Sequence, residues 1–332
     1  MPKVTVIIKA FNEAPRISAC IVAALDEARS VDGEVLLVDS VSEDDTVRIA
    51  SEHPIRIVQF DSPQDRGCGA AVQLGYQYAR GEFIYVLDAD MVLQPGFLKA
   101  ALARLTSDSS VAGVAGKLQD VAIRTLADER RDRQYRAIAG EVEVSELGGG
   151  GLYRREAIEQ VGYLAHRGLA AYEEVELGLR LRVAGWRLVR MDMIAVVHEG
   201  HRETNIQMLQ RLWRNGRAQA TGRFLRSSLG KPWFPHVARK LRHVLVIPVA
   251  YIAVFVMLLS WPSQDYHVAI GGLLVSIVGV ALAIGRRSGG GLSRGLWTLF
   301  VWNYLWFATI VGWFGVHIDP MEKIRAHEVK SI

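Results

Sequence analysis

FIYVLDAD, residues 83–90, is a run of five apolar residues that ends in two aspartates, Asp88 and Asp90. Such a run is typical of a buried strand, and open α/β sheets bind ligands at the carboxyl ends of their strands. Two carboxylates at this spacing can share one hard divalent cation, which would neutralise a diphosphate leaving group. An acidic turn is the alternative, and the preceding strand favours the cation site.

Similar short apolar runs lie on both sides of this stretch, with segments of helical character between them. This alternation predicts crossover connections and a mostly parallel sheet, so the expected fold class is α/β. We expect strands at Val4–Ile8, Val35–Val38, Ile55–Val58 and Phe83–Leu87, and helices at Arg16–Arg29 and Asp45–Glu52.

A carboxylate also follows the second expected strand, in VDSVSEDDT. Asp39 at that strand end can accept hydrogen bonds from a nucleobase or a ribose. The structural alternative is a helix N-cap, because Ser42 with Asp45 three residues later has the pattern of a capping arrangement. Both interpretations can hold, since Asp39 precedes the cap.

Two adjacent acids, Glu173 and Glu174, open the segment EEVELGLRLRVAGWRL. Acids in a first helical turn are stabilised by the helix dipole, which is the structural interpretation. The functional interpretation is that one of them is a general base that deprotonates an acceptor hydroxyl.

A histidine and a glycine run complete the candidate site. His198 ends the apolar run Met193–Val197; a lone histidine is more often structural, but one after a strand can bind a metal. Four glycines, Gly148–Gly151, either permit close backbone approach to a ligand or form a loose turn.

The bulk composition argues against other classes of protein. The net charge of +4 is too small to indicate nucleic acid as a partner. The two cysteines, Cys20 and Cys68, lie in different expected elements, which argues against a disulfide framework and favours a reducing, cytosolic setting. MPKVTVIIKA runs straight into a strand, so we expect no signal peptide.

The apolar content is concentrated at the C-terminal end of the 332 residues. Three runs there carry no Asp, Glu, Lys or Arg: Val244–Gln264, Tyr266–Gly285 and Gly295–Ile318. Each is about long enough to cross the ~30 Å hydrocarbon core as a helix. The sequence therefore predicts a membrane protein with about three transmembrane helices.

Basic residues flank these runs unevenly. They precede the first run and separate the second from the third, whereas the link around Asp265 has none. The positive-inside rule therefore places the α/β part and the second link on the cytoplasmic side. Three spans would place the basic tail outside, so the third run is alternatively re-entrant or interfacial. The flanking residues are Lys231, Arg239, Lys240 and Arg242, then Arg286, Arg287 and Arg294, then Lys323, Arg325 and Lys330.

A basic segment, Gln207–Arg226, precedes the apolar runs and interleaves five arginines with apolar residues. Its position predicts that it lies on the membrane surface, with membrane lipid as a partner. Some of its arginines, Arg211 and Arg214 among them, could instead face a pyrophosphate. A solvated basic helix is the plain alternative.

Taken together, these motifs resemble family 2 glycosyltransferases with the GT-A fold. The resemblance covers residues 3–226 and keeps the order of five motifs, which is far more specific than any one motif. It implies a Rossmann-like mixed sheet followed by transmembrane helices, and it points to bacterial exopolysaccharide enzymes similar to succinoglycan glucosyltransferases. The motifs are VTVIIKAFNE, EVLLVDSVSEDDT, DRGCGAAVQLGYQYARGEFIYVLDAD, GGGGLYRREAIEQVGY and YEEVELGLRLRVAGWRL.

The resemblance also implies a role for each matching residue. Glu174 falls at the general base, with Glu173 as its rival, and a divalent cation, Mg²⁺ or Mn²⁺, is the implied cofactor. Of the two aspartates, Asp90 is the better metal ligand. The implied nucleotide-binding residues are Phe11, Asn12, Glu13, Asp39, Arg66 and Asp88, and the implied metal ligands are Asp88, Asp90 and His198.

The chain departs from the family pattern at several positions. Ser40 stands where many relatives have a second aspartate, and Cys68 stands where a lysine is common. Glu174 replaces the usual aspartate, which moves the carboxylate by one methylene and keeps Glu173 as a rival. QRLWR lacks the spacing of the QxxRW motif, which argues against a processive polymerase.

The expected function is inverting transfer of a sugar from a nucleotide-sugar, by resemblance a UDP-sugar, to a hydroxyl of a lipid-linked or glycan acceptor. The setting is the cytoplasmic face of the cell inner membrane, in polysaccharide or glycolipid synthesis. One alternative is a polyprenyl-phosphate sugar synthase, whose acceptor phosphate needs no base. Another is a non-catalytic scaffold, against which the intact acidic motifs argue.

The expected domain organisation follows the same pattern. Residues 1–200 form the catalytic domain, with a nucleotide-binding half at 1–118 and an acceptor half at 119–200. The remaining parts are a basic interfacial segment at 201–242, a transmembrane region at 243–318 and a tail at 319–332.

Overall fold

The computed structural model describes residues 1–123, 125–148, 150–199, 203–260 and 266–331. The chain divides into two units, and the first contains both ends of the sequence. It comprises residues 1–216 together with 316–332, whereas the second comprises residues 217–315. These boundaries differ from those expected at residues 200 and 242.

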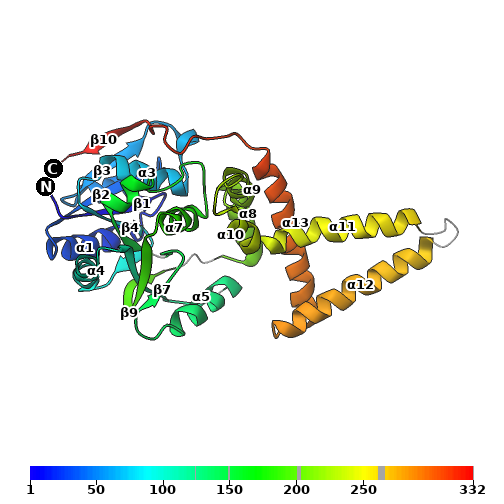
Figure 1. Ribbon diagram of the computed structural model, residues 1–332. Helices are drawn as coiled ribbons and strands as arrows, with labels where there is room; N and C mark the ends of the chain where they lie inside the picture. The colour runs from blue at the N-terminus through cyan, green and yellow to red at the C-terminus, as the bar shows by residue number, and fades with distance from the viewer. Residues whose placement is uncertain (124, 149, 200–202, 261–265, 332) are drawn as a thin grey trace. The chain divides into compact units, whose positions relative to one another are not determined.

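A mixed sheet forms the centre of the first unit (Figure 1). The strands pair in the order β10-β3-β2-β1-β4-β8-β6-β9-β5, and β7 pairs with β9. β3, β2, β1 and β4 are parallel to one another, and β8 is antiparallel to β4 and β6. The strands are β1 (Val4–Ala10), β2 (Gly33–Asp39), β3 (Arg56–Phe60), β4 (Phe83–Asp88), β5 (Met91–Leu93), β6 (Val111–Asp120), β7 (Val142–Glu143), β8 (Gly151–Arg154), β9 (Arg187–His198) and β10 (Ala326–Lys330).

Helices cover both faces of this sheet, which explains why its central strands are mostly apolar. Val6 and Ile8 of β1 pack with α1 and α4, whereas Ile7 between them packs with α3, α6 and α7. The helices of this unit are α1 (Ile17–Arg29), α2 (Thr46–Ser51), α3 (Cys68–Tyr78), α4 (Phe97–Ser107), α5 (Leu126–Arg136), α6 (Arg155–Gln160), α7 (Glu173–Val183) and α8 (Asn205–Arg214).

The four strands and two helices expected in the N-terminal part are confirmed, with boundaries shifted by a few residues at most. The expected cap of the second helix is wrong. α2 begins at Thr46, and Asp45 at its N-cap makes no side-chain hydrogen bond to the helix. The carboxylate of Asp44 accepts instead from the Thr46 amide, at 3.0 Å. Ser42 instead donates its hydroxyl to Asp39 and does not cap the helix.

The C-terminal tail is part of the sheet of the first unit. β10 pairs antiparallel with β3, which would otherwise be the edge strand. Ile324, just before β10, is buried in the core that α3 and α7 share. Glu328 accepts from the buried Arg56 guanidinium at 3.1 Å, and His327 lies 2.8 Å from Asp61.

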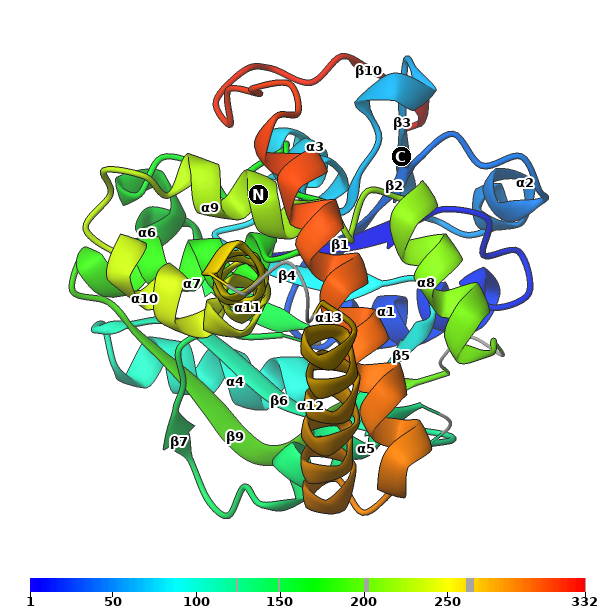
Figure 2. The same cartoon turned by 90° about the vertical axis from the view of Figure 1, so that its right-hand side faces the viewer.

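The second unit consists of helices, as the apolar runs predicted. They are α9 (Ala220–Ser227), α10 (Phe234–Lys240), α11 (Arg242–Ser260), α12 (Tyr266–Arg287) and α13 (Gly291–Trp313). α11 and α12 run in opposite directions, and α13 runs crosswise to them in Figure 1; Figure 2 looks along α11 and shows α13 lengthwise. Among the described residues, Ile270–Arg287 and Gly291–Trp313 are long and apolar enough to cross a membrane, and Val246–Met257 is a shorter apolar stretch.

Candidate active site

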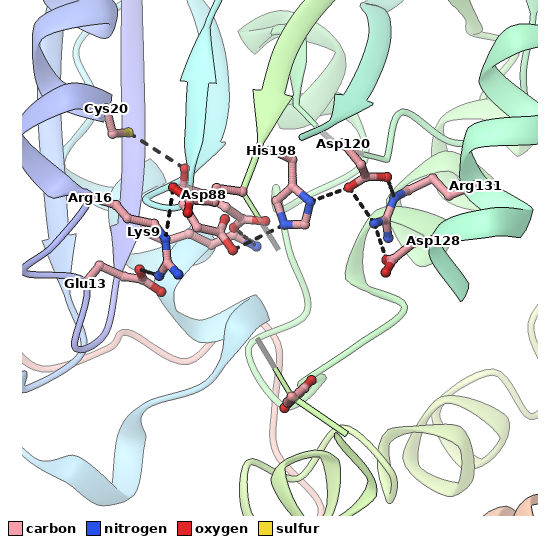
Figure 3. Close-up of polar contacts among 12 residues, drawn as sticks. Lys9, Glu13, Arg16, Cys20, Asp88, Asp120, Asp128, Arg131 and His198 are labelled. Atoms are coloured by element: carbon pink, nitrogen blue, oxygen red, sulfur yellow. Dashed lines mark hydrogen bonds and ion pairs between the residues drawn. The ribbon is translucent and has the colours of Figure 1, made fainter. Parts of the chain in front are cut away.

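Strand register brings an aspartate pair and a histidine together at the carboxyl edge of the sheet. In the ladder, His198 of β9 lies opposite Asp120 of β6 and opposite Met91 of β5, which directly follows Asp90. His198 Nδ1 lies 2.7 Å from Asp120 Oδ1 (Figure 3). The other ring nitrogen, Nε2, lies 3.3 Å from Asp90 Oδ2. Arg131 of α5 holds Asp120 in turn, through two of its nitrogens.

This arrangement fixes the orientation of the His198 ring. Burial by itself lowers the pKa of His198, but the hydrogen bonds to Asp90 and Asp120 outweigh burial and raise that pKa to about 9. A carboxylate on one ring nitrogen leaves the other nitrogen available to a cation, which is the usual support of metal-binding histidines. Nδ1 faces Asp120, so Nε2 is the nitrogen that faces Asp90.

The donor atoms fit a divalent cation held by two protein ligands. Asp90 and His198 offer one carboxylate oxygen and one ring nitrogen, a set that Mn²⁺ or Mg²⁺ can accept. Among the described residues, no group of three or more His, Cys, Asp and Glu side chains is arranged to hold a metal ion. The expected set of three ligands is therefore not assembled, because Asp88 is engaged elsewhere.

Asp88 forms an ion pair with a buried lysine of the neighbouring strand. Lys9 Nζ lies 2.9 Å from Asp88 Oδ1 and 3.7 Å from Glu173 Oε1. β1 and β4 are parallel with Lys9 directly opposite Asp88, so the pair follows from the strand register. Lys9 thus links Asp88, at the end of β4, to Glu173, at the start of α7. Figure 3 shows its ion pair with Asp88.

Glu174 lies on the other side of this charge cluster, against the glycine run. A methyl group added at Gly148 would lie 3.3 Å from Glu174 Oε2, so a larger residue there would require the Glu174 side chain to shift slightly. Burial, the neighbouring charge of Glu173 and, opposing them, Lys9 together raise the pKa of Glu174 to about 8. A carboxyl group with such a pKa can take up a proton near neutral pH. Gly149 lies outside the described residues.

The loop after β1 is tied to the loop after β2. Asn12 has a left-handed backbone, with φ of 55°, and its side chain accepts from the Glu43 amide at 2.8 Å. The Glu13 amide donates to the hydroxyl of Thr46 at 2.8 Å. These bonds position Phe11, which is 42% exposed. The Arg66 guanidinium lies 4.6 Å from the centre of the Phe11 ring, so the structure brings these two expected nucleotide-binding residues together.

Asp39 and Arg211 are already engaged by other side chains. The Asp39 carboxylate is fully buried, and it accepts hydrogen bonds from the amide and hydroxyl of Ser42 and from Gln59. Arg211 forms a two-pronged ion pair with Glu203, at 2.6 and 2.9 Å. Arg214, at the end of α8, is exposed.

Sequence reasoning missed two residues of the site, Lys9 and Asp120. Lys9 had a signal, since it is a charged residue inside the apolar run VTVIIKA. Asp120 ends a strand, but only the β6–β9 register shows that it faces His198.

Similarity to proteins of known structure agrees with the fold. The mannosyltransferase PcManGT from Pyrobaculum calidifontis, in complex with GDP-Man and Mn²⁺, has a TM-score of 0.61 at 22% identity, with 94% of this chain and 87% of that chain covered. S. aureus TarS 1-349 in complex with UDP-GlcNAc has a TM-score of 0.54 at 16% identity, with 94% and 89% covered. The sheet and these neighbours define the fold of this unit as GT-A.

Sequence similarity gives the family. Residues 5–162 match the family described as Glycosyl transferase family 2, so the chain carries a family 2 glycosyltransferase domain. Chondroitin synthase of Escherichia coli is 34% identical over 116 residues, which are 34% of this chain and only 17% of that protein. The succinoglycan biosynthesis protein ExoO of Rhizobium meliloti is 34% identical over 124 residues, or 36% and 34% of the two chains. An uncharacterized glycosyltransferase of Mycobacterium tuberculosis is 29% identical over 199 residues, or 57% and 84%.

Proposed function

We propose that this enzyme transfers a sugar from a nucleotide-sugar to a hydroxyl group of a lipid-linked or glycan acceptor, with inversion at the anomeric carbon. The observation that carries the proposal is the meeting of two acidic groups at one edge of the sheet. Asp88 ends β4 and Asp90 follows it, Glu173 and Glu174 open α7, and Lys9 bridges the two groups through Asp88 and Glu173.

The donor half of the site is formed by the loops after β1, β3 and β4. The exposed ring of Phe11, with Arg66 stacked on it, offers a flat surface for the nucleobase. Asp90 and His198 would hold the divalent cation. A cation there would neutralise the charge that develops on the departing diphosphate. Asp88, held by Lys9, faces the donor as a hydrogen-bond acceptor, and the buried Asp39 shapes the base-binding loop through Ser42 and Gln59.

The acceptor half is formed by α7 and the glycine run. Glu174 takes the proton of the acceptor hydroxyl while that oxygen attacks the anomeric carbon. The bond from this carbon to the diphosphate oxygen breaks in the same displacement, and the nucleoside diphosphate leaves. Attack from the face opposite the leaving group inverts the configuration, and no residue becomes covalently attached to the sugar.

Two further features support this proposal. Both structural neighbours hold a nucleotide-sugar, and one also holds Mn²⁺. The apolar helices of the second unit would keep the site close to a membrane, where lipid-linked sugars are available. We therefore propose a UDP-sugar or GDP-sugar as donor and the inner membrane as the location.

A donor screen tests the proposal. The purified full-length enzyme is incubated with each common nucleotide-sugar and Mn²⁺ or Mg²⁺, and release of nucleoside diphosphate is measured with and without a lipid extract. The proposal expects release from one donor or a few related donors, stimulated by the extract. No release from any donor, with the nucleotides bound, would indicate a non-catalytic scaffold.

The raised pKa of Glu174 favours one second candidate, transfer to a polyprenyl phosphate. At neutral pH a carboxyl group with this pKa is mostly in its protonated form, which cannot accept a proton, and a phosphate acceptor is already ionised and needs no base. Glu174→Gln separates the two functions. A phosphate acceptor predicts little loss of turnover in this variant, whereas a hydroxyl acceptor predicts a large loss.

A further inference from the structure

The C-terminal strand restricts how many times the chain can cross a membrane. β10 belongs to the same sheet as β1–β9, although residues 217–315 of the second unit lie between them in the sequence. A chain that leaves one side of a bilayer and returns to that side crosses it an even number of times. Three crossings would place β10 on the opposite side from β3. We propose that α11 and α12 cross the bilayer as a hairpin, and that α13 lies in the interface on the side of the catalytic unit.

The tail is held to the first unit by contacts of several kinds. The Lys330 ammonium donates to the carbonyl oxygens of Ser51 and His53, at 2.8 and 2.7 Å. Glu322 accepts from Arg167 at 3.1 Å, and Ile324 is 1% exposed. A segment bonded in this way along its whole length is a structural part of the catalytic unit.

The two ends of α13 are packed against elements that flank the hairpin. Near its C-terminal end, α9 approaches so closely that a methyl group on Gly222 would lie 1.9 Å from the Thr309 carbonyl oxygen. Arg226 of α9 also donates to the carbonyl oxygen of Trp313 at 3.0 Å. Near its N-terminal end, a methyl group on Gly295 would lie 1.8 Å from the carbonyl oxygen of Ala281, in the last turns of α12.

These contacts place both ends of α13 on one side of the membrane. α9 precedes the hairpin in the sequence, and the C-terminal end of α12 completes it. In a hairpin of two spans, the start of the first and the end of the second lie on the same side. A helix that is packed against both cannot span the bilayer, which agrees with its crosswise direction in Figure 1.

Charge selects the same pair of spans from the alternatives. If α12 and α13 crossed instead, the link between them would face outward with Arg286, Arg287 and Arg294. That arrangement violates the positive-inside rule, whereas a hairpin of α11 and α12 satisfies it. From residue 243 to its end at Ser260, α11 contains no Asp, Glu, Lys or Arg. Its 19 residues span about 28 Å at 1.5 Å per residue, close to the ~30 Å core.

The side chains of α13 suit an interfacial position. Tryptophan and tyrosine collect at the boundary between lipid and water, near the ends of helices that span. α13 carries them along its whole length, together with the polar Asn303 near its middle. The aromatic residues of this kind are Trp297, Trp302, Tyr304, Trp306 and Trp313.

Labelling of single introduced cysteines tests this topology. Full-length variants are expressed in bacterial cells and treated with a maleimide that does not cross membranes, before or after permeabilisation. Ser260→Cys, at the exposed end of α11, is expected to react in intact cells. Ser288→Cys, between α12 and α13, and Ser331→Cys, after β10, are expected to react only after permeabilisation.

The chain without substitutions is the control, since Cys20 and Cys68 lie in the catalytic unit and are expected to stay unlabelled in intact cells. Reaction of Ser288→Cys from outside would show that α12 and α13 are the spans. Reaction of Ser331→Cys from outside would show an odd number of crossings, and failure of Ser260→Cys to react from outside would show that α11 does not cross. Each result overturns the proposal, and none depends on catalytic activity.

Discussion

One buried lysine determines the charge balance of the active site. Burial alone would lower the pKa of Lys9, but the surrounding acids, Asp88 foremost, outweigh it and raise that pKa well above its ordinary value. Lys9 therefore stays protonated at all pH values at which the enzyme would work. Its charge opposes the rise in the pKa of Glu174, so this residue acts on the base as well as on the donor side.

Replacing this lysine should destabilise the fold. Lys9→Met leaves the buried Glu173 without its cationic partner, and an unsatisfied buried charged group costs about 1–3 kcal/mol or more. We therefore expect a lower free energy of unfolding at pH 8. Lys3→Met, at an exposed position before β1, serves as the control in thermal unfolding. Equal melting temperatures of the two variants would contradict this role.

Glu174 is expected to control the pH dependence of turnover. Removal of a general base costs about 10²–10⁴-fold in rate, so Glu174→Gln should lower kcat by that factor while nucleotide affinity is kept. In the unaltered enzyme kcat should rise with pH through about 8, the pKa of Glu174. Glu173→Gln should be milder, because Glu173 contacts Lys9. If Glu173→Gln is the inactive variant and Glu174→Gln is not, the base is the neighbouring residue.

The same raised pKa predicts a stability effect of known sign. The folded protein holds the Glu174 proton more tightly than the unfolded chain, and this difference adds to the free energy of unfolding. The added stability is complete below pH 4.5 and is lost as the pH rises through about 8. The amide of Glu174→Gln imitates the protonated acid. The variant should therefore melt higher than the unaltered protein at pH 8.5, and show no such gain near pH 4.

Asp88 and Asp90 could be located at this scale because they lie at the end of a recognisable strand, and Glu174 because it lies in an acidic first turn of a helix. Their roles in metal binding and catalysis stay predictions. Lys9 and Asp120 could not be assigned a role, because their partners come from strands far away in the sequence. For Asp39, the sequence correctly indicated the end of a strand. It could not indicate that hydrogen bonds from Ser42 and Gln59 already occupy the carboxylate oxygens.

At the scale of elements, β10 is the least predictable part of the fold. AHEVK has no run of apolar residues, and its pairing partner β3 lies more than 260 residues away in the sequence. An edge strand gains its stability from main-chain hydrogen bonds, which any residue except proline can make. The central strands, in contrast, are buried on both faces, so they can be recognised in the sequence as apolar runs.

A pair of substitutions in the tail tests whether this strand stabilises the catalytic unit. Ile324→Ala removes a buried side chain, and such a change costs about 2–5 kcal/mol. Val329→Ala alters an exposed residue of β10, and we expect a change within about 0.5 kcal/mol. Thermal unfolding in detergent, followed by loss of nucleotide binding, compares the two. Equal behaviour of the variants would show that the tail is not docked on β3.

At the scale of the whole molecule, the alternation of strands and helices predicted the α/β domain and the apolar runs predicted the helical unit. The number of crossings could not be predicted, because each apolar run satisfies the length criterion by itself. It depends on where the chain goes afterwards, and that is decided by a strand with no sequence signal. Local sequence patterns therefore predict the individual helices and strands, whereas the proposed number of membrane crossings follows from the pairing of β10 with the distant β3.

The most direct test of the central claim is cation-dependent release of nucleoside diphosphate by the unaltered enzyme beside Asp90→Asn. An amide is a weaker ligand than a carboxylate, so with the preferred donor we expect full activity with Mn²⁺ or Mg²⁺, none in EDTA, and none in Asp90→Asn at any cation concentration tested. Asp132→Asn, in α5 and in an ion pair with Arg136, should keep full activity. Undiminished release in EDTA, or turnover by Asp90→Asn equal to that of the unaltered enzyme, would contradict the account.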